Sequence, residues 1–140
     1  MAMVISTRIN VQTGGDCELV DITHEVAREI EESGIVDGTV TVFVPGSTGG
    51  LTTIEYERGV IGDFQSMWQR TVPRDIPYRH DAAWGDGNGH SHVRASLLGP
   101  SLVIPFVDRR MTLGTWQQIV FVDFDNRPRS RKIVLQIMGE

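Results

Sequence analysis

Three of the four histidines of this 140-residue chain lie within residues 78–100, among glycines, aspartates and an asparagine. They are His80, His90 and His92. Imidazole nitrogens bind divalent metals and carry protons near neutral pH. The glycines at positions 85, 87 and 89 leave the backbone free to turn the rings toward one another. We therefore predict that at least two of these histidines meet at a common point.

A divalent metal, zinc or magnesium, is the first interpretation of this segment. His90 and His92 would project from the same side of an extended strand, and His80 would complete a three-histidine set with an open position for water. Asp86 and Asn88 add oxygen atoms in the same loop. The alternative is a polar loop whose histidines only hydrogen-bond to the backbone. The chain has no paired Cys-x-x-Cys spacing, which would favour the zinc site, so both interpretations stay open.

A second candidate is the glycine- and hydroxyl-rich turn PGSTGGLTT, residues 45–53, which follows a predicted strand. Its backbone amides, together with the hydroxyls of Ser47 and Thr48, suit the oxygens of a phosphate or carboxylate. Glu55 lies just beyond, where an acid, a base or a magnesium ligand would be needed. The turn lacks the lysine and spacing of a P-loop, and a plain hairpin turn accounts for the glycines almost as well.

The third candidate is the pair Trp116 and Gln117, at the start of a predicted strand near the C-terminus. Trp116 offers a flat face to a heteroaromatic ring, and the amide of Gln117 would orient that ring. The alternative is that Trp116 belongs to the hydrophobic core.

Composition excludes several classes of function. The net charge of -5 and the pI near 5.3 argue against a nucleic-acid-binding surface, and the basic segment 127–132 is interpreted as a solvated hairpin end rather than an anion site. The single cysteine, Cys17, excludes an intrachain disulfide and is interpreted as structural. No segment is typical of a signal peptide or a membrane span, so we predict a cytoplasmic protein with no membrane partner.

Alternating and β-branched residues predict mostly strands. The strand segments are residues 4–11, 39–44, 51–56, 102–107, 116–124 and 132–138. A turn-like DNRP segment separates the last two and predicts an antiparallel hairpin, whose exposed edge another subunit would cover. Helices are predicted over residues 24–33, 60–71 and 91–98, the first with Thr23 as N-cap and Gly34 at its end. We expect one α+β domain, residues 1–140, a mostly antiparallel β-sheet sandwich with two or three short helices.

Taken together, these segments resemble the YjbQ-like family, also called the secondary thiamine-phosphate synthase family. The resemblance covers nearly the whole chain. Its most specific motifs are Tyr-x-His, Asp-Gly-Asn, and His followed by Ser-Leu-Leu-Gly-x-Ser. The matching residues are Tyr78, His80, Asp86, Gly87, Asn88, His92, Ser96, Leu97, Leu98, Gly99 and Ser101. The family's Gly-Thr-Trp-Gln matches residues 114–117, and its Leu-Thr-x-x-Glu matches residues 51–55.

The resemblance implies a compact β-rich fold and a homotrimer with pockets near the subunit boundaries. It also implies a weak ability to join a pyrimidine diphosphate to a thiazole phosphate, which yields thiamine phosphate and pyrophosphate. The chain departs from the family pattern at Gly46, where members usually carry histidine. We therefore expect weaker activity here, which Gly46→His would raise, unless His90 replaces the missing histidine.

The predicted function is therefore chemistry on a small phosphorylated molecule, either thiamine-phosphate synthesis or a related transfer or hydrolysis at a phosphorylated heterocycle. The catalytic residues would be His92, Asp86 and Glu55, the substrate-binding residues Ser47, Thr48, Asn88, Trp116 and Gln117, and the metal ligands His80, His90 and His92. The alternative is a non-catalytic trimer that binds a metal or a metabolite.

Overall fold

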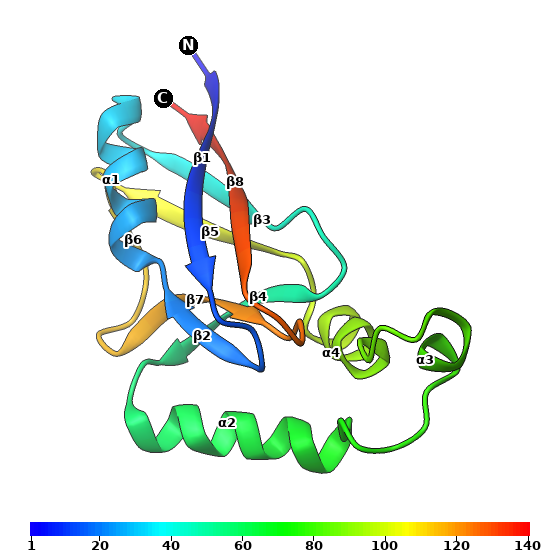
Figure 1. The fold of residues 1–140 in the computed structure, drawn as a ribbon. Coiled ribbons are helices and arrows are strands. Elements are labelled where there is room, and N and C mark those ends of the chain that lie inside the picture. Colours follow the sequence, from blue (N-terminus) through cyan, green and yellow to red (C-terminus); the bar gives the residue numbers. More distant parts are fainter.

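A computed structural model describes residues 1–140 as two antiparallel sheets and four helices (Figure 1). The larger sheet has the order β1-β8-β3-β5-β6. Its strands are β1 (Met3–Thr13), β8 (Arg129–Gly139), β3 (Gly38–Phe43), β5 (Ser101–Val107) and β6 (Arg110–Met111). The smaller sheet has the order β2-β7-β4, and its strands are β2 (Glu18–Asp21), β7 (Gln117–Asp123) and β4 (Gly49–Glu55). The predicted α+β class is confirmed.

The predicted hairpin between the last two strands is wrong. β7 pairs with β2 and β4 in the smaller sheet, whereas β8 lies between β1 and β3 in the larger one. Ile119 to Val122 are all buried, so β7 needs apolar neighbours on both of its faces. β8 buries only alternate residues, as a strand in an outer sheet does. Both strands are central in their sheets. Neither therefore presents the exposed edge that another subunit was expected to cover.

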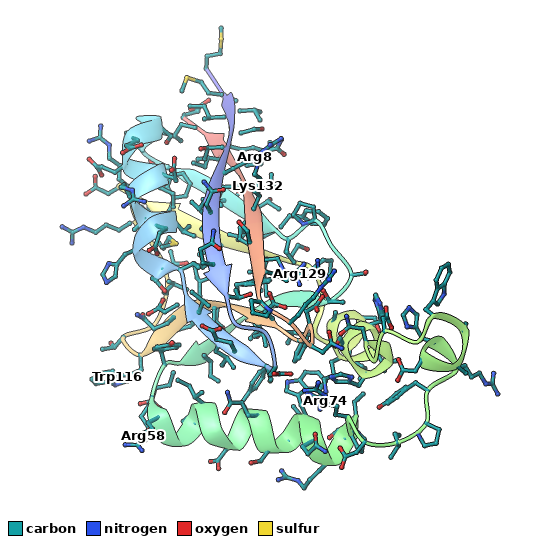
Figure 2. The ribbon with its side chains drawn as sticks, in the orientation of Figure 1. Arg8, Arg58, Arg74, Trp116, Arg129 and Lys132 are labelled. Atoms are coloured by element: carbon teal, nitrogen blue, oxygen red, sulfur yellow. The ribbon has the colours of Figure 1, made fainter.

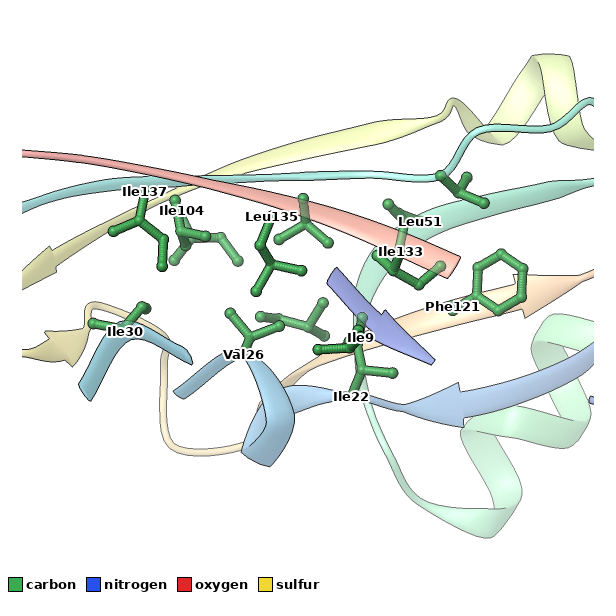
Figure 3. Packing of buried hydrophobic residues seen from close by; sticks show 14 of the residues in the cluster. Ile9, Ile22, Val26, Ile30, Leu51, Ile104, Phe121, Ile133, Leu135 and Ile137 are labelled. Atoms are coloured by element: carbon green, nitrogen blue, oxygen red, sulfur yellow. The ribbon is translucent and has the colours of Figure 1, made fainter. Parts of the chain in front are cut away.

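The larger of two hydrophobic clusters lies between the two sheets and α1 (Thr23–Ser33), as Figure 3 shows. Val26 and Ile30 extend from α1 toward Leu135 and Ile137 of β8. Phe121 of β7 enters the same cluster from the smaller sheet. Burial of such side chains contributes roughly 1.5–3 kcal/mol each, which makes this cluster the main source of stability.

The second cluster lies on the other face of the smaller sheet. It joins Val120, Val122 and Phe124 to α2 (Arg58–Thr71) and α4 (Gly89–Leu98). Trp68 of α2 meets Phe124 edge to face, with 5.0 Å between ring centroids. This packing fixes α4 against the end of the smaller sheet and thereby positions the histidine segment.

The helices follow the sequence with two differences. α1 ends at Gly34, whose φ of 75° makes the predicted left-handed cap, but Thr23 is the first helical residue rather than the N-cap. Its hydroxyl instead donates to Asp21 Oδ1 and accepts from the Ile119 amide, which ties the helix to the smaller sheet. A short helix, α3 (Arg79–Trp84), forms inside the predicted loop, so the structure has four helices rather than two or three. None of these helices combines the length and apolar character needed to cross a bilayer.

Candidate functional site

Most of the histidine segment is helical rather than extended. α3 and α4 are joined by residues 85–88, where Gly85 and Gly87 adopt φ values of 68° and 69°. Successive residues of an α-helix are rotated by about 100°, so His90 and His92 in the first turn of α4 point about 200° apart. The prediction that these two histidines share one side is therefore wrong.

His80, Asp86 and His92 come together where α3, the linking turn and α4 meet. One ligand atom from each lies within 4.8 Å of the others, and the rings of His80 and His92 are 4.5 Å apart between centroids. His80 Nδ1 is shielded from water and has no hydrogen bond, although Asp86 Oδ1 lies 3.2 Å away, out of line with the ring N–H. Two of the three predicted histidines thus approach a common point, with Asp86 in the place expected for His90.

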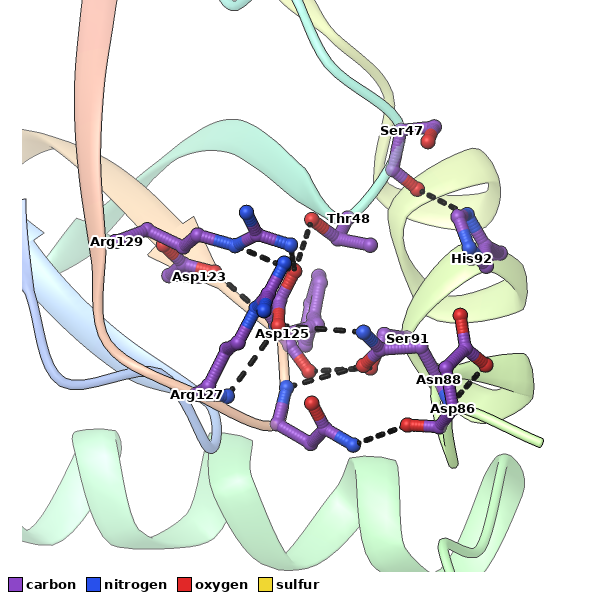
Figure 4. A network of polar contacts seen from close by, with 12 residues as sticks. Ser47, Thr48, Asp86, Asn88, Ser91, His92, Asp123, Asp125, Arg127 and Arg129 are labelled. Atoms are coloured by element: carbon purple, nitrogen blue, oxygen red, sulfur yellow. Dashed lines mark hydrogen bonds and ion pairs between the residues drawn. The ribbon is translucent and has the colours of Figure 1, made fainter. Parts of the chain in front are cut away.

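His92 is held in place by the glycine-rich turn. Its Nδ1 lies 3.0 Å from the carbonyl oxygen of Ser47, so the ring donates its Nδ1 proton there (Figure 4). The lone pair is then on Nε2, which is the arrangement of a histidine that ligates a metal through Nε2. A cavity of about 250 Å³ lies at this contact and is lined by Gly46, Ser47, Gly49, His92, Ala95, Ser96 and Pro100. The turn and the histidine segment therefore meet, as predicted.

A buried ionic network supports the turn from the other side (Figure 4). Asp123 and Asp125 are fully buried, and Arg131 makes two hydrogen bonds to Asp123, both 2.9 Å long. Arg129 donates to Asp125 Oδ2 over 3.0 Å. Thr48 Oγ1 donates to Asp125 and accepts from Arg131, so the turn is fixed to both charges.

Asn88 and Thr48 serve this network rather than an open surface. Asn88 Nδ2 donates to Asp125, and Asn88 Oδ1 accepts from Ser91 and from the Asn126 amide. Both side chains are buried, and their polar atoms already have protein partners. Their side chains therefore position the residues that face the cavity, and substrate contact by either side chain stays a prediction.

Glu55, Trp116 and Gln117 lie at the far end of the smaller sheet. From Gly49 to Glu55, β4 advances six residues, or roughly 20 Å at about 3.3 Å per residue. Trp116 is 72 % exposed rather than in the core, and Figure 2 shows it at the opposite end from α4. Gln117 donates to Thr53 Oγ1. A separate cavity of about 430 Å³ is formed there by Asp21, Glu55, Tyr56, Glu57, Thr115, Trp116 and Gln118. One subunit therefore does not bring all the predicted site residues together.

Sequence comparison matches residues 7–140 to the family described as UPF0047 protein YjbQ-like. The chain belongs to the YjbQ-like family. A UPF0047 protein of Methanothermobacter thermautotrophicus is 39 % identical over 137 residues, which cover 98 % of this chain and 94 % of that protein. The UPF0047 protein YugU of Bacillus subtilis is 31 % identical over 132 residues, 94 % of this chain and 97 % of its own.

Solved structures of similar proteins share the fold. The crystal structure of a YbjQ-like protein from Sulfolobus solfataricus P2 has a TM-score of 0.94 and 34 % sequence identity, and each chain is covered completely. A YjbQ/UPF0047 family protein from Clostridium acetobutylicum has a TM-score of 0.86 and 36 % identity, over 94 % of this chain and 98 % of that chain. The β-rich architecture is therefore that of the YjbQ-like family.

His90, the third histidine of the predicted metal site, lies outside the His80–Asp86–His92 cluster of this YjbQ-like protein. It is 2 % exposed and faces Tyr78, with 6.4 Å between the ring centroids. Burial lowers the pKa of His90, and the positive charges of Arg94 and Arg74 lower it further. His90 therefore stays neutral at neutral pH, and it does not occupy the place of the histidine that the family usually carries at position 46.

Gly46 has a backbone conformation suited to glycine. Its φ of 147° is one that residues with side chains rarely adopt, and a Cβ there would lie 3.3 Å from Arg131 Nη1. A histidine introduced at position 46 would therefore be strained as well as chemically different. The effect of Gly46→His on activity would combine both causes, so the strain-matched comparison is with Gly46→Ala.

Sequence reasoning missed Asp123, Asp125 and Arg131 as parts of the site. It interpreted the basic segment as solvated, whereas the Arg131 side chain is only 11 % exposed. The available signal was the pattern Asp-x-Asp followed by Arg-x-Arg across a short turn. Buried carboxylates need cationic partners, and a short turn brings these arginines close enough to pair with them.

Proposed function

We propose that the chain binds a divalent metal through His80, Asp86 and His92 and acts, by transfer or hydrolysis, on a phosphate-bearing small molecule held at the adjoining turn. The observation that carries this proposal is the grouping of these three ligand atoms within 4.8 Å beside the Ser47 carbonyl that orients His92. The site is accessible, because the His80 and Asp86 side chains are 34 % and 46 % exposed.

Zinc fits this donor set better than magnesium. Two imidazoles and one carboxylate are typical of catalytic zinc sites with an open position, whereas magnesium prefers oxygen ligands. Tetrahedral zinc bonds of about 2.0–2.1 Å place ligand atoms roughly 3.3 Å apart. The 3.2 Å between His80 Nδ1 and Asp86 Oδ1 already matches this spacing.

The turn beside the metal ligands offers donors for phosphate oxygens. The amide N–H groups of residues 46–48 have no protein acceptor. Arg131 Nη1 lies next to Gly46 and makes no hydrogen bond, unlike Nε and Nη2 of the same side chain. Exposed amides and a guanidinium stabilise the negative charge that develops on a departing phosphate or pyrophosphate.

Thiamine-phosphate formation is the specific reaction that the family resemblance suggests. In that reaction a pyrimidine diphosphate is joined to a thiazole phosphate and pyrophosphate leaves. The metal ligands, the free amides and Arg131 suit the departure of pyrophosphate. Glu55 and Trp116 stand too far away within one subunit to act on the same substrate molecule.

The test is turnover by the purified protein after chelation and addition of zinc or magnesium. We expect pyrophosphate release from the two thiamine precursors, or phosphate release from related phosphorylated heterocycles, to require the metal. His92→Ala should abolish turnover without unfolding the protein. The matched control is His24→Ala, because His24 is exposed on α1, away from the cluster.

Two outcomes would count against the enzyme. Zinc binding without turnover of any of these substrates would leave the alternative, a non-catalytic metal- or metabolite-binding protein. Equal turnover in His92→Ala and wild type would contradict the proposed site itself.

We also propose that the protein is cytoplasmic and that it works as a homotrimer, the assembly that the family resemblance implies. The outward face of β5 supports assembly, because Val103 and Val107 are 63 % and 60 % exposed and flank Pro105. We expect sedimentation at micromolar concentration to give a trimer, and Val103→Glu to shift it toward monomer. A wild-type protein that sediments only as a monomer would contradict this proposal.

A further inference from the structure

A polar cavity of about 260 Å³ lies on the side of α4 that faces away from the His80–Asp86–His92 cluster. It is formed by the end of α2, the first turns of α4 and the turn before β2. Its lining residues are Asp16, Cys17, Gln65, Gln69, Arg74, His90 and Arg94. The proposed function makes no use of this cavity.

Arg94 brings a buried positive charge to this cavity. The residue is 5 % exposed, and it donates from Nε to the Val72 carbonyl over 2.9 Å and from Nη2 to Gln69 Oε1 over 3.2 Å. Both acceptors are neutral. Its remaining N–H groups have no protein acceptor, and no carboxylate forms an ion pair with it. Burial lowers the pKa of Arg94, yet a guanidinium remains protonated at neutral pH.

No neighbouring group pairs directly with Arg94 as an anion. Asp16 is already paired with Arg74 at the mouth of the cavity. Burial raises the pKa of the Cys17 thiol to about 11, so it is neutral at physiological pH. Burial likewise raises the pKa of Tyr78, whose hydroxyl donates to the Pro73 carbonyl. A buried charge without a counter-charge is costly, so an anion in the cavity would stabilise this arrangement.

His90 also lines this cavity and has a buried polar atom without a partner. The residue is 2 % exposed, and its Nδ1 is buried without a hydrogen-bond partner, while Nε2 lies 3.3 Å from Ser91 Oγ. Buried polar atoms in folded proteins almost always have partners, so such an orphan indicates a ligand or water.

We propose that this cavity binds the anionic oxygens of a small carboxylate or phosphate, with Arg94 as the charged donor. Its volume is below the range of about 300–1,000 Å³ that is typical of pockets for drug-sized ligands, so the occupant is a small anion or the anionic end of a larger molecule. Planar guanidinium groups bind both carboxylate and phosphate oxygens in pairs. The site is independent of the metal cluster.

The experiment uses chelator-treated protein and calorimetric titration with inorganic phosphate, with acetate, and with chloride at matched ionic strength. We expect phosphate or acetate to bind and chloride to give no comparable signal, and the better of the two identifies the ligand class. Arg94→Met should weaken that binding roughly 10- to 100-fold. Arg70→Met is the matched control, because Arg70 is an exposed arginine of α2, and it should bind as wild type does.

His92→Ala separates this site from the proposed function. It should keep anion binding intact even if it loses metal and turnover, because His92 points away from the cavity. Equal binding by Arg94→Met and wild type, or no binding of either oxyanion by wild type, would overturn the proposal. Should Arg94→Met fail to fold, the imidazole NMR signals of His90 in wild type decide: they must shift on anion addition, and unchanged signals would reject the site.

Discussion

Asp125→Ala is expected to destabilise the protein by about 3–5 kcal/mol, because it removes one partner from a buried ion pair. Asp125 is fully buried and accepts hydrogen bonds from the side chains of Thr48, Asn88 and Arg129. The substitution would remove the charged acceptor of all three side-chain donors at once. Urea unfolding measures the change, and Asp63→Ala on the exposed face of α2 should alter the free energy of unfolding by less than about 0.5 kcal/mol. Comparable midpoints for the two variants would contradict this account of the network.

The same network predicts how stability responds to acid. Burial alone would raise the pKa of Asp125, but hydrogen bonds from Arg129, Asn88 and Thr48 outweigh it and leave the pKa below its ordinary value of 3.8. A carboxylate whose pKa is lower in the folded state stabilises the fold above the unfolded pKa, and this contribution is lost as pH falls through the folded pKa. Wild type should therefore lose stability below about pH 4 more steeply than Asp125→Asn, in unfolding measured from pH 7 to pH 2.

Zinc is expected to stabilise the wild-type protein by about 4 kcal/mol when its free concentration is a thousand times the Kd, and chelation should reverse the effect. The ligands His80, Asp86 and His92 come from three successive segments, α3, the linking turn and α4. Metal binding would hold these segments together in the folded state only. Thermal unfolding with and without zinc measures the stabilisation.

Two variants make this expectation specific. His92→Ala and Asp86→Asn each remove one ligand, so each should lose most of the zinc-dependent stabilisation. His24→Ala should retain it, because His24 lies outside the cluster. Equal stabilisation of His92→Ala and wild type would show that zinc binds elsewhere, and would remove the basis for the proposed function.

The strands and helices that are long and strongly patterned could be predicted from the sequence. β1, β3, β5 and β8 follow period-two alternation, and α2 follows helical spacing, so local side-chain pattern determines them. β2 and β6 were missed, because four and two residues carry too few positions to show a period, and α3 was missed because its six residues make fewer than two helical turns. α3 is also followed directly by glycines at positions 85, 87 and 89, which indicate a loop.

The His80–Asp86–His92 cluster lies in the segment that the sequence singled out, but its members differ from the predicted set of three histidines. The predicted set joined His90 to His92 because a strand places alternate residues on one side, whereas a helix sends these two to opposite sides. His90 therefore faces Arg94 and the second cavity, and Asp86 takes its place beside His80 and His92. The spacing of the residues cannot choose between these outcomes without the backbone conformation.

The sequence by itself determined the family, the α+β class and the residue types available for metal and phosphate chemistry, because motifs and periodicity are local properties of the chain. Only the tertiary structure decided that Ser47 orients His92, that Arg131 pairs with Asp123 beside Gly46, and that Glu55 lies at the far end of β4. These relations join segments that are distant along the chain. They depend on how the two sheets and α4 pack around β7. Because β7 contributes residues to both hydrophobic clusters, its two faces are covered only in the complete fold.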